Sequence, residues 1–158
     1  MVIVPRNQGD IRICVDLSEM NKNIQRESYP MTSVDYTLTE FNSAKIFSVI
    51  DAYSGFWQIM LHPESSVLTT FITPYDLFKF QLLLFGISSA PEVFQKRIRE
   101  CLKGLDGVIG MMDEFVVCGE TEQEHDVKLY QLLQRLQDSG WTLNAEKCQF
   151  RGRSLSIF

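Results

Sequence analysis

The stretch Val108-Ile109-Gly110-Met111-Met112-Asp113-Glu114-Phe115-Val116-Val117-Cys118 places two adjacent carboxylates between two apolar runs of strand length. This pattern predicts a β-hairpin with Asp113 and Glu114 at its bend. A two-residue bend favours Asn-Gly, Asp-Gly or a glycine with positive φ, and no Gly or Asn lies between Met111 and Phe115. We therefore expect backbone strain at this bend, and strain kept at a bend is a pointer to function.

Asp113 and Glu114 also pose an electrostatic problem. Adjacent carboxylates against an apolar sheet repel each other and lose solvation, so one of them takes up a proton, reaches water or pairs with a cation. No Lys or Arg lies between Lys103 and Lys128. A divalent cation, magnesium or manganese, is one solution, because both prefer hard oxygen ligands. The alternative is a solvent-exposed acidic bend that only ends two strands.

Asp51 is a third candidate anion. It ends the β-branched and aromatic run that starts at Lys45, and no basic residue lies close to it in the sequence on its C-terminal side. An Asp at the end of a strand is most often a cap or a turn residue. Here Gly55 follows closely and permits a close backbone approach beside the carboxylate. Phe56 and Trp57 add aromatic surface, which by default belongs to a core.

The composition excludes several classes of protein. The 158 residues are 45% hydrophobic and 22% charged, which is typical of one globular domain. The chain has no apolar run of about 18 residues and no signal-peptide pattern, so we expect an intracellular protein, cytoplasmic or nuclear, with no membrane partner. Four scattered cysteines and two histidines give no zinc spacing, and we expect reduced thiols. The net charge of −5 argues against a free-standing nucleic-acid binder.

Strand and helix signals follow one another along the rest of the chain. We expect a strand over 11–17, a helix capped by Ser33, a hairpin of 67–73 and 77–84, a helix from the capping box at Ser89 to Lys103, a helix from the capping box at Thr121 to Gly140, and short strands at 141–143 and 148–150. This order predicts an α+β fold in which helices pack on an antiparallel sheet.

The two long helices have distinct faces. The first carries a buried stripe of Phe94, Ile98, Cys101 and Leu102 and a basic face of Lys96, Arg99 and Lys103, which is either solvated or a groove for phosphates. In the second, we expect Val127, Tyr130, Leu133 and Leu136 to point inward and His125 to be exposed.

From about Ile11 to Phe150 the chain resembles the fingers and palm of a reverse transcriptase, most closely the gypsy-like LTR retrotransposon and retrovirus-like group. The resemblance rests on the order and spacing of several short matches. They are Arg12-Ile13-Cys14-Val15-Asp16, Glu19-Met20-Asn21-Lys22, Tyr29-Pro30, the run from Phe47 to Phe56, Gln58-Ile59, His62-Pro63-Glu64, Phe85-Gly86, Ala90-Pro91, Phe94-Gln95, Leu143-Asn144 and Glu146-Lys147-Cys148.

The resemblance implies an RNA-directed DNA polymerase that transfers nucleotides from dNTP to a primer 3′-hydroxyl with two Mg²⁺ (or Mn²⁺) ions. It implies that Asp51, the carbonyl of Ala52, and Asp113 bind metal, and that Glu114 stands at the third catalytic acid. It further implies nucleotide binding by Arg12, Phe56, Phe85 and Gly86, with Phe56 screening the sugar 2′ position. Template and primer contacts fall on Met111, Met112, Lys96 and Arg99.

The chain departs from the family pattern at the bend. Where the family has Tyr-x-Asp-Asp, this chain has Met111 in place of the tyrosine and Glu114 in place of the second aspartate. The longer side chain moves the charge outward by one methylene, and magnesium tolerates little geometric error. The family's terminal Phe-Leu-Gly is also not clean in Ser154-Leu155-Ser156-Ile157-Phe158.

The resemblance implies a right-hand polymerase architecture without a thumb. Fingers are expected at about 1–30 and 67–85, and palm at about 31–66 and 86–158. We expect a fragment of a pol polyprotein whose parent element supplies ribonuclease H, integrase and protease. Its partners would be a primed RNA or DNA template and dNTP. A catalytically inactive remnant or nucleic-acid-binding module that keeps the palm is the alternative, and an unrelated acidic α+β interaction protein is the third possibility.

Overall fold

The computed structural model describes residues 2–5, 11–26 and 43–154. By its internal contacts the chain divides into two compact units, one formed by residues 1–27 and 56–90 and the other by residues 28–55 and 91–158. We refer to them as unit 1 and unit 2 and describe each by itself. The expected helix capped by Ser33 lies outside the described residues.

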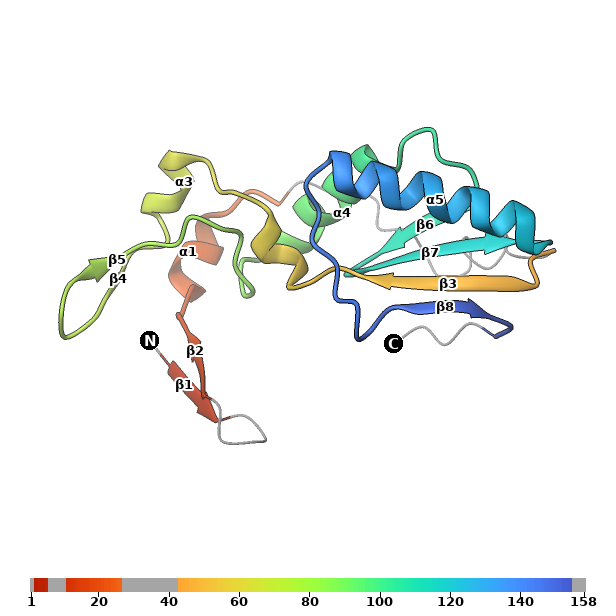
Figure 1. Ribbon diagram of the computed structural model, residues 1–158. Helices are drawn as coiled ribbons and strands as arrows, with labels where there is room; N and C mark the ends of the chain where they lie inside the picture. The colour runs from red at the N-terminus through yellow and green to blue at the C-terminus, as the bar shows by residue number, and fades with distance from the viewer. Residues whose placement is uncertain (1, 6–10, 27–42, 155–158) are drawn as a thin grey trace. The chain divides into compact units, whose positions relative to one another are not determined.

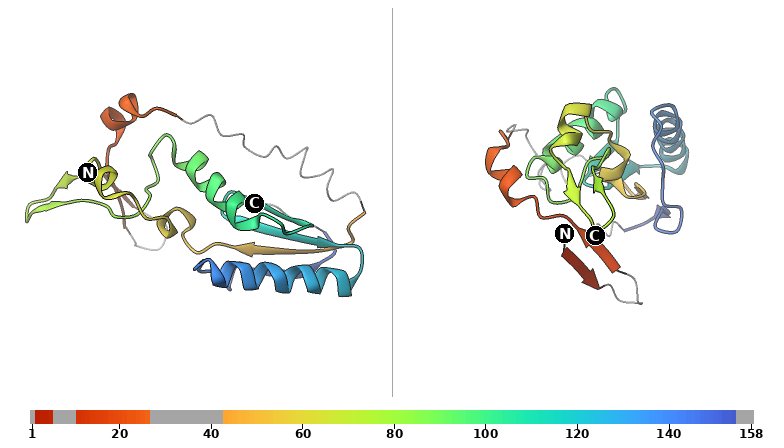
Figure 2. Two further views of the ribbon diagram at one scale, coloured as in Figure 1. Left: turned by 90° about the horizontal axis from the view of Figure 1, so that it is seen from above. Right: turned by 90° about the vertical axis from the view of Figure 1, so that its left-hand side faces the viewer.

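Unit 2 contains a four-stranded antiparallel sheet in the order β6-β7-β3-β8 (Figure 1). The strands are β3 (Ile46–Asp51), β6 (Val108–Met111), β7 (Glu114–Gly119) and β8 (Gln149–Gly152), and the helices are α4 (Ala90–Leu102) and α5 (Glu122–Asp138). Seen from above, α5 runs lengthwise along the strands (Figure 2). The predicted hairpin at 108–118, the strand that ends at Asp51 and both long helices are confirmed.

Both helices pack on the same face of this sheet. Strand register places Ile50 opposite Phe115 and Phe115 opposite Gly110, so these residues share one face. A side chain at Gly110 would collide with Ile98 of α4, and one at Gly119, on the same face, would meet the backbone of His125 in α5. Burying a large apolar side chain such as Phe115, which has 0% exposure, stabilises a fold by roughly 1.5–3 kcal/mol.

Helix α4 buries the predicted stripe, since Phe94, Ile98, Cys101 and Leu102 have exposures of 9% or less. Helix α5 begins as predicted, with the Thr121 hydroxyl accepting a hydrogen bond from Glu124 N at 3.3 Å.

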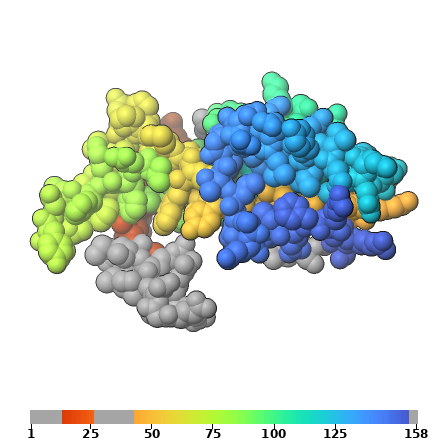
Figure 3. Space-filling model, in the orientation of Figure 1, coloured from red at the N-terminus to blue at the C-terminus, as the bar shows by residue number. Residues whose placement is uncertain are grey.

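The predicted inward face of α5 is wrong in part, because Val127 and Tyr130 are 58% and 69% exposed. The expectation that His125 is exposed is also wrong. The buried positions are His125, Leu132 and Leu136. An imidazole can take a core position when its ring nitrogens find hydrogen-bond partners, and Ser48 of β3 supplies one. Figure 3 shows the outer surface of α5 beside the surface formed by β8 and the residues that lead to it.

Unit 1 is built from short elements. They are β1 (Val2–Pro5), β2 (Ile11–Cys14), α1 (Ser18–Asn23), η1 (Gly55–Gln58, whose first residue belongs to unit 2), α3 (Pro63–Val67), β4 (Phe71–Ile72) and β5 (Leu77–Phe78). Strands β1 and β2 pair with each other, as do β4 and β5. A cluster of Leu17, Leu83, Leu84, Ile87 and Ala90 forms the core, with Phe56 and Phe80 among the side chains packed against it.

Three predicted strand ranges in unit 1 are too long. The strand expected over 11–17 ends at Cys14, and the hairpin expected from 67–73 and 77–84 pairs only β4 with β5. Pro63 starts α3 at a position that favours proline, and this helix takes up the start of the expected range. The hydroxyls of Ser66 and Thr69 both donate to the carbonyl of Phe80. The segment after β5 is therefore held by side-chain hydrogen bonds and not by strand pairing.

Candidate active site

The end of β3 brings Asp51 to the β6–β7 bend. Antiparallel pairing of β3 with β7 sets Asp51 directly opposite Glu114. One residue further on, Ala52 N donates a hydrogen bond to the carbonyl of Asp113 at 2.7 Å. Asp51 is nearly buried, with 8% exposure. The folded sheet therefore collects Asp51, Asp113 and Glu114, which are distant in sequence, at one edge.

The bend itself is strained, as the sequence predicts. Met112 has φ of 50°, in the left-handed region that L-residues avoid at a cost of roughly 1–2 kcal/mol. Its side chain is 68% exposed, so burial of this side chain does not explain the conformation. The bend is held in place by contacts that Asp113, the next residue, makes with residues outside the hairpin.

Gly55 is one of those contacts. A Cβ at this position would lie 2.5 Å from Asp113 Oδ1 and 2.7 Å from Phe94 Cζ. The predicted close approach at Gly55 is present, although the carboxylate that the structure records there is Asp113. Only glycine leaves room for this carboxylate without a shift of its neighbours.

Burial and mutual repulsion raise the pKa values of the acids at the bend. Burial is the larger cause for Asp113, the charge of Asp51 adds to it, and Lys147 opposes both. The pKa of Glu114 is raised by burial first, then by Asp51, while Lys147 lowers it. Both carboxylates therefore ionise less readily than free side chains, which is the condition that a bound cation relieves.

Lys147 is a residue that the sequence analysis missed in this role. Its Nζ lies 3.7 Å from Asp51 Oδ2, and its side chain is 68% exposed. The segment before it runs beside the end of β3, where Asn144 N donates to the carbonyl of Asp51 at 2.9 Å. A search for cations near the bend in sequence could not find it, because the partner arrives from a later segment through sheet pairing.

The donor set at this edge suits a hard divalent cation. It offers the carboxylates of Asp51, Asp113 and Glu114 and the backbone carbonyl of Ala52, all of them oxygen ligands. Within residues 11–26 and 43–154, no group of three His, Cys, Asp or Glu side chains is gathered as a ready metal cage. The fit therefore rests on the oxygen chemistry and on the mutual repulsion of the acids.

The expected nucleotide residues that the structure describes lie together in unit 1. The rings of Phe56 and Phe85 have centroids 4.6 Å apart. Gly86 has φ of 98°, which requires glycine, and its carbonyl accepts a hydrogen bond from Asn21 Nδ2 at 2.7 Å. Asn21 Oδ1 accepts from Ser88 N at 2.9 Å. Asn21 thus holds this loop at two points, and only its place in a family motif could have signalled it.

Arg12 lies in β2 opposite Val4, but its side chain is outside the described residues. On α4, Lys96 and Arg99 are exposed, as expected for the basic face. Gln95 on the same helix is 2% exposed and donates to the carbonyl of Gly110 at 3.0 Å. Gln95 therefore connects α4 to the strand that leads into the bend.

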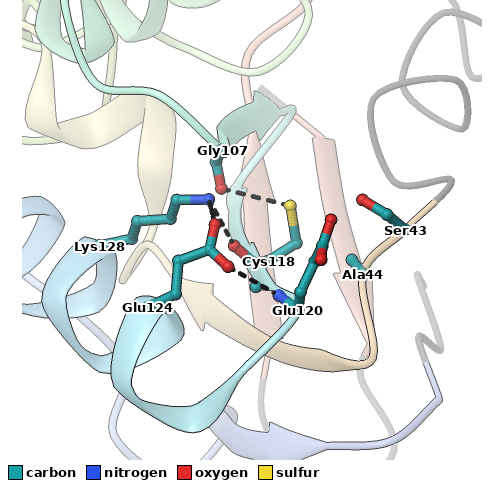
Figure 4. A pocket seen from close by; sticks show the side chains of 8 residues that line it. Ser43, Ala44, Gly107, Cys118, Glu120, Glu124 and Lys128 are labelled. Atoms are coloured by element: carbon teal, nitrogen blue, oxygen red, sulfur yellow. Dashed lines mark hydrogen bonds and ion pairs between the residues drawn. The ribbon is translucent and has the colours of Figure 1, made fainter.

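A separate hollow of about 200 Å³ lies where α5 meets the end of β7 (Figure 4). Lys128 Nζ donates to Glu124 Oε1 at 2.5 Å and to the carbonyl of Cys118 at 3.4 Å, and Glu124 Oε2 accepts from Glu120 N at 3.0 Å. These bonds complete the start of α5, so we assign no ligand to this hollow. All four cysteines are free, as predicted.

The antiparallel sheet with two helices on one face is the arrangement that the sequence resemblance predicts for the palm. The sequence pattern of the reverse transcriptase (RNA-dependent DNA polymerase) family matches residues 4–157, and the chain belongs to this family.

Relatives and solved structures agree with this membership. The enzymatic polyprotein of Cauliflower mosaic virus (strain NY8153) is 32% identical over 95% of the chain. Two foamy viral protease-reverse transcriptase structures match the fold, one in complex with ds DNA (TM-score 0.87, 22% identity, 98% of the chain) and one in complex with RNA/DNA hybrid (TM-score 0.83, 24% identity, 94% of the chain). The chain spans 22% of the plant virus polyprotein and 27% and 20% of the two foamy viral chains.

These likenesses confirm the predicted α+β fold of a reverse transcriptase fingers and palm fragment. No helix among the described residues is long and apolar enough to cross a membrane.

Proposed function

We propose that this chain is the polymerase part of a longer pol polyprotein and transfers nucleotides from dNTP to the 3′-hydroxyl of a primer on an RNA template. The observation that carries the proposal is the meeting of Asp51 with the strained bend of Asp113, through strand pairing and the bond from Ala52 N. The foamy viral neighbours were solved with ds DNA and with RNA/DNA hybrid, which supports a primed template as the partner.

Asp51, Asp113 and the carbonyl of Ala52 would hold two magnesium ions, with manganese as the substitute. Bound ions of this kind activate the attacking hydroxyl and stabilise the charge on the leaving pyrophosphate. The protein's own part is to hold the acids in place. Gly55 admits the Asp113 carboxylate, and the register of β3 and β7 positions Asp51.

We assign nucleotide selection to unit 1. Phe56 would screen the 2′ position of the sugar, and Phe85 with Gly86 would line the nucleotide pocket. Arg12 would bind the phosphates of the nucleotide, and Lys96 and Arg99 those of the template. Met111 and Met112 would contact the primer. In this assignment the fingers comprise about 1–30 and 67–85, the palm about 31–66 and 86–158, and the parent element is of the gypsy-like LTR type.

Glu114 provides the sharpest test, because the family has aspartate at this place. Primer extension on an RNA template is measured with Mg²⁺ and with Mn²⁺ for the native chain and for Glu114→Asp. We expect metal-dependent synthesis that is faster in Glu114→Asp, since the shorter acid brings the charge back by one methylene. No incorporation by either protein with either metal would refute polymerase activity and favour a binding module, which template binding by the same two proteins would then measure.

A further inference from the structure

Four residues of unit 2 form a closed ring of hydrogen bonds, and none of them is one of the three acids of the candidate site. Ser48 Oγ lies 2.9 Å from His125 Nε2, and His125 Nδ1 lies 3.1 Å from Asp126 Oδ1. The guanidinium of Arg151 donates to both oxygens of Asp126. Arg151 N donates to Ser48 Oγ at 3.1 Å and so completes the ring. Ser48 and His125 are fully buried, and the ring joins β3, α5 and β8.

The ring sits on an irregularity of the sheet. Phe47 pairs with Gly152 and Val49 pairs with Gln149, so β8 uses one more residue than β3 between the two pairs. Arg151 lies in this bulge with φ of 53°. A β-bulge leaves its extra residue out of the ladder. Here the displaced N–H of Arg151 binds the Ser48 hydroxyl, and its side chain binds Asp126.

The carboxylate of Asp126 fixes the protons of the ring for a neutral imidazole. Asp126 only accepts, so the single proton of the imidazole sits on Nδ1 and is donated to Asp126. Nε2 is then the acceptor for the Ser48 proton, and the Ser48 oxygen accepts from Arg151 N. The hydrogen bonds from Arg151 and His125 lower the pKa of Asp126, which keeps this carboxylate an acceptor.

We propose that Ser48, His125, Asp126 and Arg151 form a latch that fixes the bulged register of β8 and thereby holds the segment 142–148 beside Asp51. β8 follows this segment directly, and the segment supplies both Asn144, bonded to the carbonyl of Asp51 at 2.9 Å, and Lys147. The four are positioning residues, since they touch no acid of the site. The effect on catalysis rests on the proposed function, whereas the latch does not.

The hydrogen bonds of the ring suit an imidazole with a single proton. A protonated His125 would turn an Nε2–H toward Ser48, whose own proton would then need another acceptor in a fully buried place. The charged groups around the ring are Asp126 on α5, Arg151 on β8 and Glu122, whose charge acts on Arg151. Strand β3 presents the uncharged Ser48, and β7 presents Gly119 against the His125 backbone.

The first test reads the imidazole of the native chain by ¹⁵N NMR. We expect His125 in the Nδ1–H form at neutral pH, with Nε2 shifted as an acceptor. His62, whose side chain is 70% exposed, is the internal reference. An Nε2–H tautomer or a charged His125 ring at neutral pH would overturn the latch, and this result does not depend on any variant folding.

The second test measures amide hydrogen exchange in Ser48→Ala. We expect exchange at Arg151 and Asn144 to accelerate at least about tenfold, as expected when a buried hydrogen bond worth about 1.4 kcal/mol is lost. Ser66→Ala, which removes a buried hydroxyl in unit 1, should leave both amides unchanged. Unchanged exchange at Arg151 in a folded Ser48→Ala protein would refute the latch. Faster exchange at Arg151 with unchanged exchange at Asn144 would show that the latch does not hold the segment 142–148 beside Asp51. Both results concern the latch alone and say nothing about polymerase activity.

Discussion

Two hairpins of this chain each carry an aspartate in the bend, and they are held in opposite ways. In β4–β5, Thr73 Oγ1 accepts from Tyr75 N and Asp76 N, and Asp76 Oδ1 accepts from Leu77 N at 2.7 Å. This bend satisfies its own backbone groups. In β6–β7, Met112 is strained, and Asp113 is held by Ala52 N and by the space over Gly55.

The difference separates a bend that is stable by itself from one that depends on the surrounding fold. A bend with local side-chain bonds can form by itself, and its acid is free to stay in water. A strained bend whose acid is partly buried persists only where the surrounding fold over-determines it. The position of Asp113 is therefore a property of the whole of unit 2.

The largest expected effect is on primer extension, when the aspartate of each bend is replaced in turn. Asp113→Asn should lower primer extension by roughly a hundredfold or more, in line with the loss of one preorganised charge at a reacting centre. Asp76→Asn changes the same residue type in the self-contained bend and should leave the rate unchanged. Extension assays with equal amounts of both folded variants measure this. Equal rates for the two variants would remove the functional distinction between the hairpins.

The next effect concerns the support from outside the bend. Gly55→Ala places a methyl group against Asp113 Oδ1 and Phe94 Cζ, and we expect a loss of about 1–3 kcal/mol in the free energy of unfolding, as for other overpacked sites. Denaturant unfolding gives this value. In a double-mutant cycle, Asp113→Ala should recover part of the loss, because one of the two clashing groups is removed. Strict additivity would mean that Gly55 does not hold the bend.

The sequence alone predicts the strained bend better than the self-contained one. The runs at 46–51 and 108–119 are long and apolar, so their period identifies strands, and the missing turn residues identify the strain later found at Met112. In unit 1 the strands are only two residues long, and hydroxyl bonds of Ser66 and Thr69 replace the ladder. The spacing of hydrophobic residues in the sequence does not indicate such side-chain hydrogen bonds.

Contacts between residues that are distant in sequence are the second feature that the sequence pattern does not predict. Lys147 reaches Asp51 because β8 pairs with β3, and His125 is buried because Ser48 receives it. Both facts depend on which strands become neighbours. The sequence predicts an exposed His125 because a polar residue in the first turn of a helix usually faces water. In the structure His125 is buried, since its hydrogen bond with Ser48 outweighs that tendency.

A smaller effect follows from the raised pKa values of Asp113 and Glu114. The folded chain binds these protons more tightly than the unfolded chain, whose values are near 3.8 and 4.5. Without metal, their contribution to stability is fully present below those values and is lost as pH rises through the raised folded values. Asp113→Asn should therefore be more stable than the native chain at neutral pH, and the difference should shrink on acidification.

Urea unfolding of both proteins across this pH range, with chelator present, measures that difference. Acids far from the bend cancel in the comparison, since both proteins share them, whereas the pKa of Glu114 falls when the charge of Asp113 is removed. A native chain that is more stable than Asp113→Asn at neutral pH would contradict the repulsion at the bend.

The smallest effect compares the two bends through their backbones. Met112→Gly should leave the free energy of unfolding unchanged or raise it by up to about 1 kcal/mol, because relief of a left-handed residue, roughly 1–2 kcal/mol, exceeds the entropy cost of glycine. Tyr75 is 93% exposed and has no positive φ, so Tyr75→Gly has only the entropy cost and should lower stability by roughly 0.4–1 kcal/mol. Urea unfolding of the two variants gives the signs. The same sign at both positions would mean that the bend of Asp113 stores no backbone strain, and its conformation would then need no support from Ala52 or Gly55.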